Sequence, residues 1–165
     1  MSNLGTLSYF LGIEFVRSEE GVVMNQEKNI TNVLKKLDML DCNSTATPVQ
    51  TGNVLCKGNP DDQKVDATLY RQMIGSLRYI CNSRPDIAYG IGLVSRHMED
   101  PRHSHMIVVK RLLRYLKGSI NFGVLFPVNK SNKQSQYMVT LMHIRVETEM
   151  IERAPRDIYS NLVRL

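Results

Sequence analysis

The sequence of 165 residues has no tryptophan, few other aromatic residues and three cysteines. Cys42, Cys56 and Cys81 are odd in number, widely spaced and without a Cys-x-x-Cys pair, which argues against a disulfide framework or a cysteine zinc site. No apolar run approaches the roughly 18 to 20 residues of a membrane span. The N-terminus lacks the basic and apolar regions of an export signal. We therefore expect a soluble, intracellular chain with no membrane partner, although the sequence assigns no compartment.

Most arrangements that support catalysis are also missing. The sequence contains no Gly-x-Ser-x-Gly motif for a serine nucleophile and no glycine-rich phosphate loop. Its single Asp-Asp pair, Asp61 and Asp62, follows Asn59-Pro60 in a polar stretch with no flanking strand. A metal site needs ligands held in fixed geometry by a supporting shell, so a solvated turn is expected here instead. We predict no catalytic residue on this chain.

Three histidines form the other candidate cluster. His97, His103 and His105 straddle a predicted helix end and Pro101, and no fourth ligand is apparent. Structural zinc needs four ligands in tetrahedral geometry, so surface or capping histidines are the expected reading of this pattern. The sequence therefore predicts no metal site and no cofactor.

The clearest pattern lies between residues 66 and 118, where three helix-length segments follow one another. In each, apolar residues recur at the three- and four-residue spacing that lines one face of a helix. Asp66 or Thr68 can cap the first segment, Pro85 suits the first turn of the second, and Gly118 ends the third. The predicted apolar faces are Leu69, Met73, Leu77 and Ile80; Ile87, Ile91, Val94 and Met98; and Met106, Val109, Leu113 and Leu116.

The flanking segments predict strands and one more helix. Residues 7–15 (LSYFLGIEF) are rich in strand formers, a turn follows at residues 18–21, and Val22 to Met24 form a second short strand. A helix from Gln26 is expected to pack on this hairpin, residues 41–65 are a polar crossover, and residues 120–126 form a strand. The fold class is therefore α+β: an N-terminal β-hairpin plus helix, a polar crossover, a three-helix unit, a closing strand and an irregular tail.

Basic residues concentrate in the helical block. Residues 66–118 hold nine Lys or Arg against four Asp or Glu, whereas residues 1–65 hold six against eight. Lys110, Arg111, Arg114 and Lys117 share one side of the third predicted helix, where phosphates of a nucleic acid could dock. The alternative is an ordinary solvated helix face, which is also usually charged.

Several collinear blocks of the sequence resemble copia-type retrotransposon Pol. They are LSYFLGIEF, MNQEKNITNVLKKLDMLDCNSTATPV and YRQMIGSLRYICNSRPDIAYGIGLVSRHMEDPRHSHMIVVKRLLRYLKGSINFGVLF, and together they cover roughly residues 4–126. The resemblance is to the C-terminal part of the reverse transcriptase. It implies that Phe10, Leu11 and Gly12 belong to a primer-grip-like hairpin and that the helical block corresponds to thumb and connection elements.

The resemblance also implies an organisation of the chain. Its units would be a palm-end hairpin and helix at 1–40, a crossover linker at 41–65, a thumb/connection-like helical unit at 66–126 and a tail at 127–165. The family binds Mg²⁺ at a Tyr-x-Asp-Asp turn that lies upstream of the resembling region, and this sequence does not contain that turn. We therefore expect a fragment of an RNA-directed DNA polymerase without catalysis, which binds a nucleic-acid duplex weakly and without sequence specificity.

The tail departs from the family, which continues into an intact ribonuclease H. A nucleotide sequence that encodes the tail resembles the missing ribonuclease H opening when it is translated one base out of frame. Our hypothesis is a one-base slip near residues 134–139. Because the hairpin is expected to leave an unpaired edge and an apolar face, self-association is a further expectation. The alternative function is a small basic interaction protein that binds a protein partner.

Overall fold

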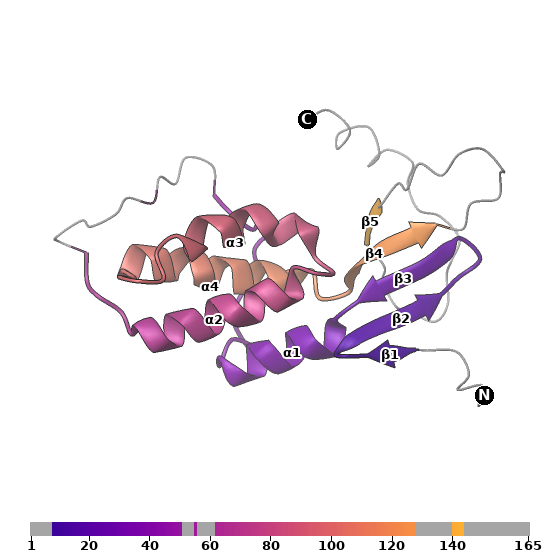
Figure 1. Ribbon diagram of the computed structural model, residues 1–165, viewed down its shortest axis with the longest axis horizontal. Coiled ribbons are helices and arrows are strands. Elements are labelled where there is room, and N and C mark those ends of the chain that lie inside the picture. Colours follow the sequence, from indigo (N-terminus) through magenta and orange to yellow (C-terminus); the bar gives the residue numbers. More distant parts are fainter. Residues whose placement is uncertain (1–7, 51–54, 56–61, 128–139, 144–165) are drawn as a thin grey trace.

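The computed structural model describes residues 8–50, 55, 62–127 and 140–143, and the structural statements below concern these residues. It contains a group of helices and an antiparallel sheet, which lie side by side (Figure 1). The predicted α+β class is thus confirmed. The strands are β1 (Tyr9–Phe10), β2 (Ile13–Arg17), β3 (Gly21–Asn25), β4 (Phe122–Pro127) and β5 (Thr140–His143). The helices are α1 (Glu27–Lys36), α2 (Ala67–Ile80), the 3₁₀ turn η1 (Pro85–Ile87), α3 (Ala88–Ser95) and α4 (His103–Gly118).

The sheet joins the two ends of the described chain. Its strand order is β1-β2-β3-β4-β5, and every neighbouring pair is antiparallel. The chain leaves the sheet after β3, forms the helices, and returns at β4, where Val23 pairs with Leu125 and Val22 with Phe126. The predicted closing strand therefore extends the N-terminal hairpin. As a result, the inner edge of that hairpin is covered, and β1 is the edge strand on its other side.

The first predicted strand is in fact a tight hairpin. Residues 7–15 were expected to form one strand, but β1 and β2 are joined by a two-residue turn at Leu11 and Gly12, with Phe10 opposite Ile13. Leu11 has φ +49° and Gly12 has φ +80°, the positive values at both central positions that characterise a type I′ turn. Gly12, which has no Cβ atom, adopts its positive φ without strain and so allows this reversal.

Part of the tail has regular structure. No element was predicted beyond Pro127, but Thr140–His143 form β5 and pair with β4, with Leu125 opposite Thr140. Without β5, one edge of β4 would expose unpaired backbone N–H and C=O groups, and pairing of this kind depends on a strand distant in sequence rather than on a local pattern. The rest of the tail, including the site of the hypothetical frame slip, lies outside the described residues.

The four helices share one apolar core. The periodicity correctly predicted α2 and α4, whereas the second predicted helix is divided into η1 and a shorter α3 that ends before Met98. Ile30 and Leu34 of α1 are buried in this same core rather than only against the hairpin, so the core continues across the boundary predicted at residue 41. Its other fully buried members include Tyr70, Ile74, Leu77, Ile80, Ile87, Val94, Val109, Leu112, Leu113 and Leu116.

A buried arginine connects the helices to the sheet. Arg84, which precedes η1, is completely buried. Its guanidinium pairs with both carboxylate oxygens of Asp86, at 3.0 and 2.6 Å, and donates to the backbone oxygen and the hydroxyl of Ser119, both at 2.6 Å. Ser119 lies between the end of α4 and the start of β4, so Arg84 fixes the point where the chain returns to the sheet.

Two aromatic rings complete this site. The guanidinium carbon of Arg84 lies 5.2 Å from the ring centre of Phe122 and 5.6 Å from that of Tyr115. Burial raises the pKa of Tyr115 to about 12, so the phenol is neutral beside the Arg84–Asp86 pair at neutral pH. A cation that has lost its hydration shell gains from such rings as well as from its carboxylate.

We expect replacement of Arg84 by Met to lower the free energy of unfolding by about 3–5 kcal/mol, because Asp86 and the Ser119 carbonyl would lose a buried charged partner. A further Asp86→Leu substitution should recover part of the loss, since an apolar pair leaves no unpaired charge. Urea denaturation followed by circular dichroism measures both changes. A loss below about 1 kcal/mol for Arg84→Met would show that the buried pair does not support the fold.

Candidate nucleic-acid interface

The tip of the β1–β2 hairpin exposes apolar side chains. Tyr9, Phe10 and Leu11 have exposed fractions of 52%, 54% and 71%. The hydroxyl of Tyr79, on α2, donates a hydrogen bond to the backbone oxygen of Leu11, so the turn is attached to the helical layer. The structure thus presents the predicted residues Phe10, Leu11 and Gly12 together, in a fixed turn.

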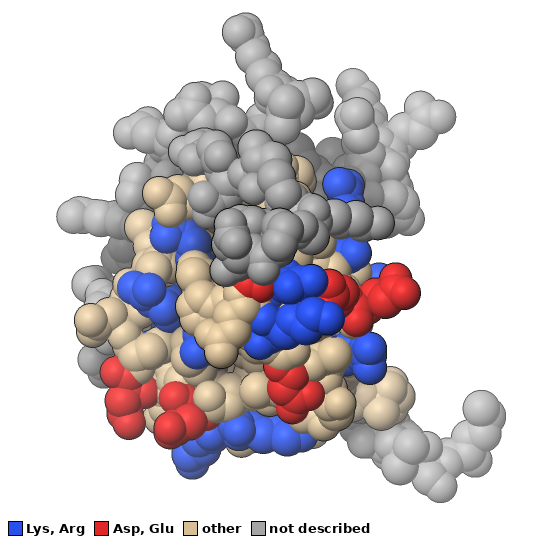
Figure 2. Space-filling view, turned by 90° about the vertical axis from the view of Figure 1, so that its left-hand side faces the viewer, with Lys and Arg blue, Asp and Glu red and all other residues tan. Residues whose placement is uncertain are grey.

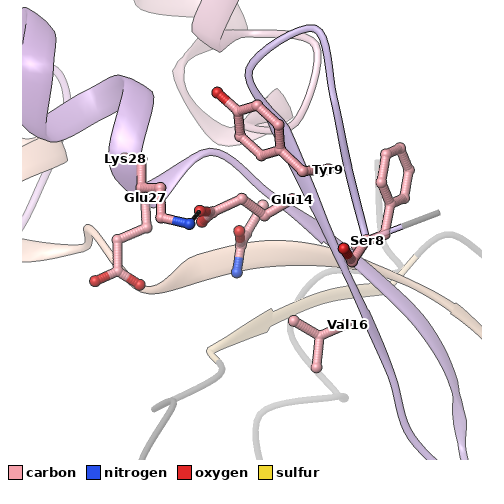
Figure 3. A pocket seen from close by; sticks show the side chains of 8 residues that line it. Ser8, Tyr9, Glu14, Val16, Glu27 and Lys28 are labelled. Atoms are coloured by element: carbon pink, nitrogen blue, oxygen red, sulfur yellow. Dashed lines mark ion pairs between the residues drawn. The ribbon is translucent and has the colours of Figure 1, made fainter.

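A pocket of about 440 Å³ lies at the base of this hairpin, next to the start of α1. In Figure 3, Lys28 reaches the carboxylate of Glu14, with the ring of Tyr9 close by. The two charged groups are 2.9 Å apart, and the Glu14 hydrogen bond raises the pKa of Lys28. This pair neutralises its own charge, and Glu27 leaves the lining with a net negative charge, which disfavours a phosphate ligand. Its lining residues are Ser8, Tyr9, Glu14, Phe15, Val16, Asn25, Glu27 and Lys28.

The four predicted phosphate-binding residues of α4 are in different environments. Lys110 is exposed, whereas Arg111, Arg114 and Lys117 are partly buried beneath the crossover segment, residues 41–50. The three partly buried cations donate hydrogen bonds to that segment: Arg111 to the Thr47 hydroxyl at 2.8 Å, Arg114 to the Asn43 carbonyl at 2.8 Å, and Lys117 to the Cys42 carbonyl. Lys110 is therefore the residue of the four that faces solvent most freely.

Packing also holds the C-terminal end of the crossover segment, near Val49, against α3 and α4. A Cβ atom at Gly90 of α3 would lie 2.8 Å from Val49 and 2.7 Å from Leu112, so the absence of a side chain there lets Val49 approach the helices closely. The Thr45 amide donates to the Arg114 carbonyl at 3.4 Å. The basic side of α4 thus has a structural role that charge patterning alone did not indicate.

Two of the candidate metal ligands, Asp62 and His105, stabilise the start of α4. Asp62 accepts a hydrogen bond from the Ser104 amide at 3.2 Å, and hydrogen bonding from the Ser104 side chain and, to a lesser extent, from this amide lowers the pKa of Asp62. His105 accepts from the Arg102 amide at 3.0 Å, so the capping role expected of it is observed. Its ring stacks on that of His97 at 3.8 Å, and both are buried rather than on the surface. Asp61 lies outside the described residues.

Charge at the helical end of the molecule is mixed. Figure 2 faces that end, and Lys or Arg side chains alternate there with Asp or Glu. Asp100, for example, lies 2.6 Å from Arg102 and 3.5 Å from Lys64. Pairs of this kind cancel at a distance, so this end creates no strong field for a polyanion. Within the described residues, no group of three or more His, Cys, Asp or Glu side chains is placed to hold a metal ion, and no helix is long and apolar enough to cross a membrane.

Curated proteins with similar sequences include several from transposons. The chain is 36% identical over 118 residues to the retrovirus-related Pol polyprotein from transposon RE2 of Arabidopsis thaliana, covering 72% of this chain and 8% of that protein. A Pol polyprotein from a Nicotiana tabacum transposon is 34% identical over 143 residues, which cover 79% of this chain and 11% of the relative. The chain is a homologue of retrotransposon Pol polyproteins. The resemblance to retrotransposon Pol is therefore confirmed.

This Pol homologue also matches an uncharacterised mitochondrial protein of Arabidopsis thaliana, at 32% identity over 136 residues, 81% of this chain and 54% of that protein. It thus spans about half of one relative and about a tenth of the polyproteins. No family model matches the sequence. No solved structure matches it either.

The β1–β2 turn leads to a prediction about stability. A leucine in the left-handed region costs about 1–2 kcal/mol, whereas asparagine tolerates it, and Asn-Gly is the preferred pair of a type I′ turn. We expect Leu11→Asn to raise the free energy of unfolding by about 0.5–1 kcal/mol, and Leu11→Val, with its branched side chain, to lower it. Urea denaturation compares the two variants. A less stable Leu11→Asn variant would mean that the exposed leucine contributes contacts which outweigh the turn strain.

Proposed function

We propose that this Pol homologue corresponds to the C-terminal part of a copia-type reverse transcriptase, and that as a separate chain it binds a nucleic-acid duplex weakly without catalysing a reaction. The observation that carries the proposal is the collinear similarity to Pol polyproteins over most of the chain. The structure supports it with two accessible features: the exposed turn at residues 10–12 and the exposed cation Lys110 on α4.

These two features suit contact with a duplex in different ways. Lys110 can neutralise a phosphate, a contact that positions a nucleic acid but carries no sequence information. Phe10 and Leu11 are exposed apolar groups in a fixed turn, and an aromatic ring can stack on an unpaired base or pack on a sugar. Because Arg111, Arg114 and Lys117 already bind the crossover segment, Lys110 is the one of the four predicted α4 cations without such a contact, and the expected affinity is low.

The proposed lack of catalysis rests on the missing two-metal site. Nucleotidyl transfer needs carboxylates that clamp two metal ions against the attacking and leaving oxygens. The Tyr-x-Asp-Asp turn that the resemblance assigns to this task does not occur in the sequence. Asp62, the second residue of the Asp-Asp pair, accepts a hydrogen bond from the Ser104 backbone amide at the start of α4.

A second candidate function is docking of a protein partner or a second copy of the chain. The favouring observation is the apolar character of the hairpin tip, where Tyr9, Phe10 and Leu11 are all more than half exposed beside the edge strand β1. An exposed edge with apolar side chains is a common site of protein association.

Salt dependence tests the duplex-binding proposal. Each phosphate contact on B-form DNA contributes about 0.9 to the slope of log K against log salt, so Lys110→Ala should reduce the slope by about that amount. The matched control is Lys35→Ala, which removes an exposed cation from α1 and should leave the slope unchanged. Fluorescence anisotropy with a labelled duplex measures both. Equal changes of the slope in the Lys110→Ala and Lys35→Ala variants would indicate a diffuse electrostatic field rather than a contact at Lys110. If the chain binds no duplex at low salt, the protein-docking function remains.

Primer extension tests the absence of catalysis. With a homopolymer template, its primer and Mg²⁺ or Mn²⁺, the purified chain should incorporate no nucleotide, because it lacks the carboxylate clamp. Incorporation that disappears when Asp61 and Asp62 are both replaced by Asn would contradict the proposal and would assign those carboxylates a metal.

A further inference from the structure

The contact between Thr47 and Arg111 has properties that neither the fold nor duplex binding explains. Thr47 is exposed, and its hydroxyl oxygen accepts a hydrogen bond from Nη2 of Arg111 at 2.8 Å. Nε of the same guanidinium is buried and has no hydrogen-bond partner among the described residues. An arginine presents Nε and Nη2 along one edge as a fork that matches two oxygens of a carboxylate or phosphate. The single hydroxyl oxygen of Thr47 accepts from Nη2 and leaves Nε without an acceptor.

We propose that Thr47 is a phosphorylation site and that Arg111 holds the resulting phosphate. In this reaction a protein kinase transfers the γ-phosphoryl group of ATP to Oγ1 of Thr47. The bond from that phosphorus to ADP breaks, a P–Oγ1 bond forms, and the hydroxyl proton is released. The new phosphate carries three acceptor oxygens at the position where Nη2 already meets Oγ1, so it supplies the second acceptor that Nε lacks.

The surroundings of Thr47 make this site accessible and positively charged. Pro48 follows it, which favours an extended backbone at Thr47, and the sequence contains no other Ser-Pro or Thr-Pro pair. Lys110 precedes Arg111 on α4 and is exposed, and Arg114 lies one turn further along. Within the described part of the chain, no salt bridge joins these three α4 cations to a carboxylate. A phosphate at Thr47 therefore meets Arg111, which forms no salt bridge with a carboxylate among the described residues.

The consequence is a firmer attachment of the crossover segment. At present, neutral carbonyl and hydroxyl acceptors hold residues 42–47 against α4, and hydrogen bonds to a doubly charged phosphate are roughly twice as strong. A second consequence rests on the proposed function: about −1.5 to −2 added charge at Arg111, the residue after Lys110 in the chain, should weaken duplex binding. The attachment of the crossover segment can be measured without nucleic acid. A negative result for the attachment can therefore be distinguished from a negative result for duplex binding.

The first experiment asks whether the folded chain is modified. The full chain is incubated with ATP and a protein kinase that selects Thr-Pro, and the modified residue is identified by mass spectrometry. We expect one phosphate, on Thr47, and none in the Thr47→Val variant, which keeps the size of the side chain. Phosphorylation of a residue other than Thr47 would overturn the proposal. So would the absence of phosphorylation in the folded chain under conditions in which the kinase phosphorylates the unfolded chain.

The second experiment asks whether Arg111 holds the phosphate. In ³¹P NMR, the second ionisation of phosphothreonine has a pKa of about 6, and pairing with a guanidinium should lower the value at position 47 by about one unit. Arg111→Gln should restore the ordinary value, and phosphoserine introduced at the exposed position 44 is the control that should show the smaller shift. A pKa at position 47 equal to that of the unfolded chain would overturn the assignment of Arg111.

Discussion

The structure depends on one fully buried charge. Arg84 lies where the helices end and the chain returns to the sheet, and its guanidinium joins Asp86 at the start of η1 to Ser119 at the end of α4. An unpaired guanidinium at this position would cost several kcal/mol in lost hydration. The carboxylate, a carbonyl, a hydroxyl and two aromatic rings compensate for that loss, and this requirement fixes where β4 begins. Because β4 pairs with β3, the same interaction indirectly positions the hairpin whose tip we propose as a contact with nucleic acid.

Basic residues in this chain serve the fold as well as the surface. Arg84 is internal, Arg111, Arg114 and Lys117 hold the crossover segment, and Arg102 binds Asp100 and the Asp62 carbonyl. These five residues of the helical block donate hydrogen bonds to groups of the chain, so fewer of its N–H donors are available to phosphates than the number of Lys and Arg in the sequence suggests. The attachment of residues 41–50 to α4 also places Thr47 beside an arginine, and the proposed modification would strengthen an existing contact rather than create a new one.

Local patterns were sufficient for the helices and insufficient for the sheet. Apolar spacing correctly predicted α2 and α4, because a stripe such as Met73, Leu77 and Ile80 directly reflects one buried face. The same reasoning missed the turn at Leu11 and Gly12, since a leucine with positive φ is rare and its neighbours are strong strand formers. It also missed β5, whose pairing with β4 has no local signal. For the site, spacing grouped the four α4 cations, but their contacts with residues 42–47 depend on a segment more than sixty residues earlier.

The central claim is that this Pol homologue folds around the Arg84 site and that, as proposed, its hairpin tip and Lys110 both contact a nucleic-acid duplex. An amide NMR titration of the ¹⁵N-labelled chain with a short duplex at low salt tests it most directly. The account predicts concentration-dependent shifts for Phe10, Leu11, Gly12 and Lys110, with Lys35 and Lys36 of α1 unaffected. Shifts confined to other residues, or equal shifts over every exposed lysine, would contradict it.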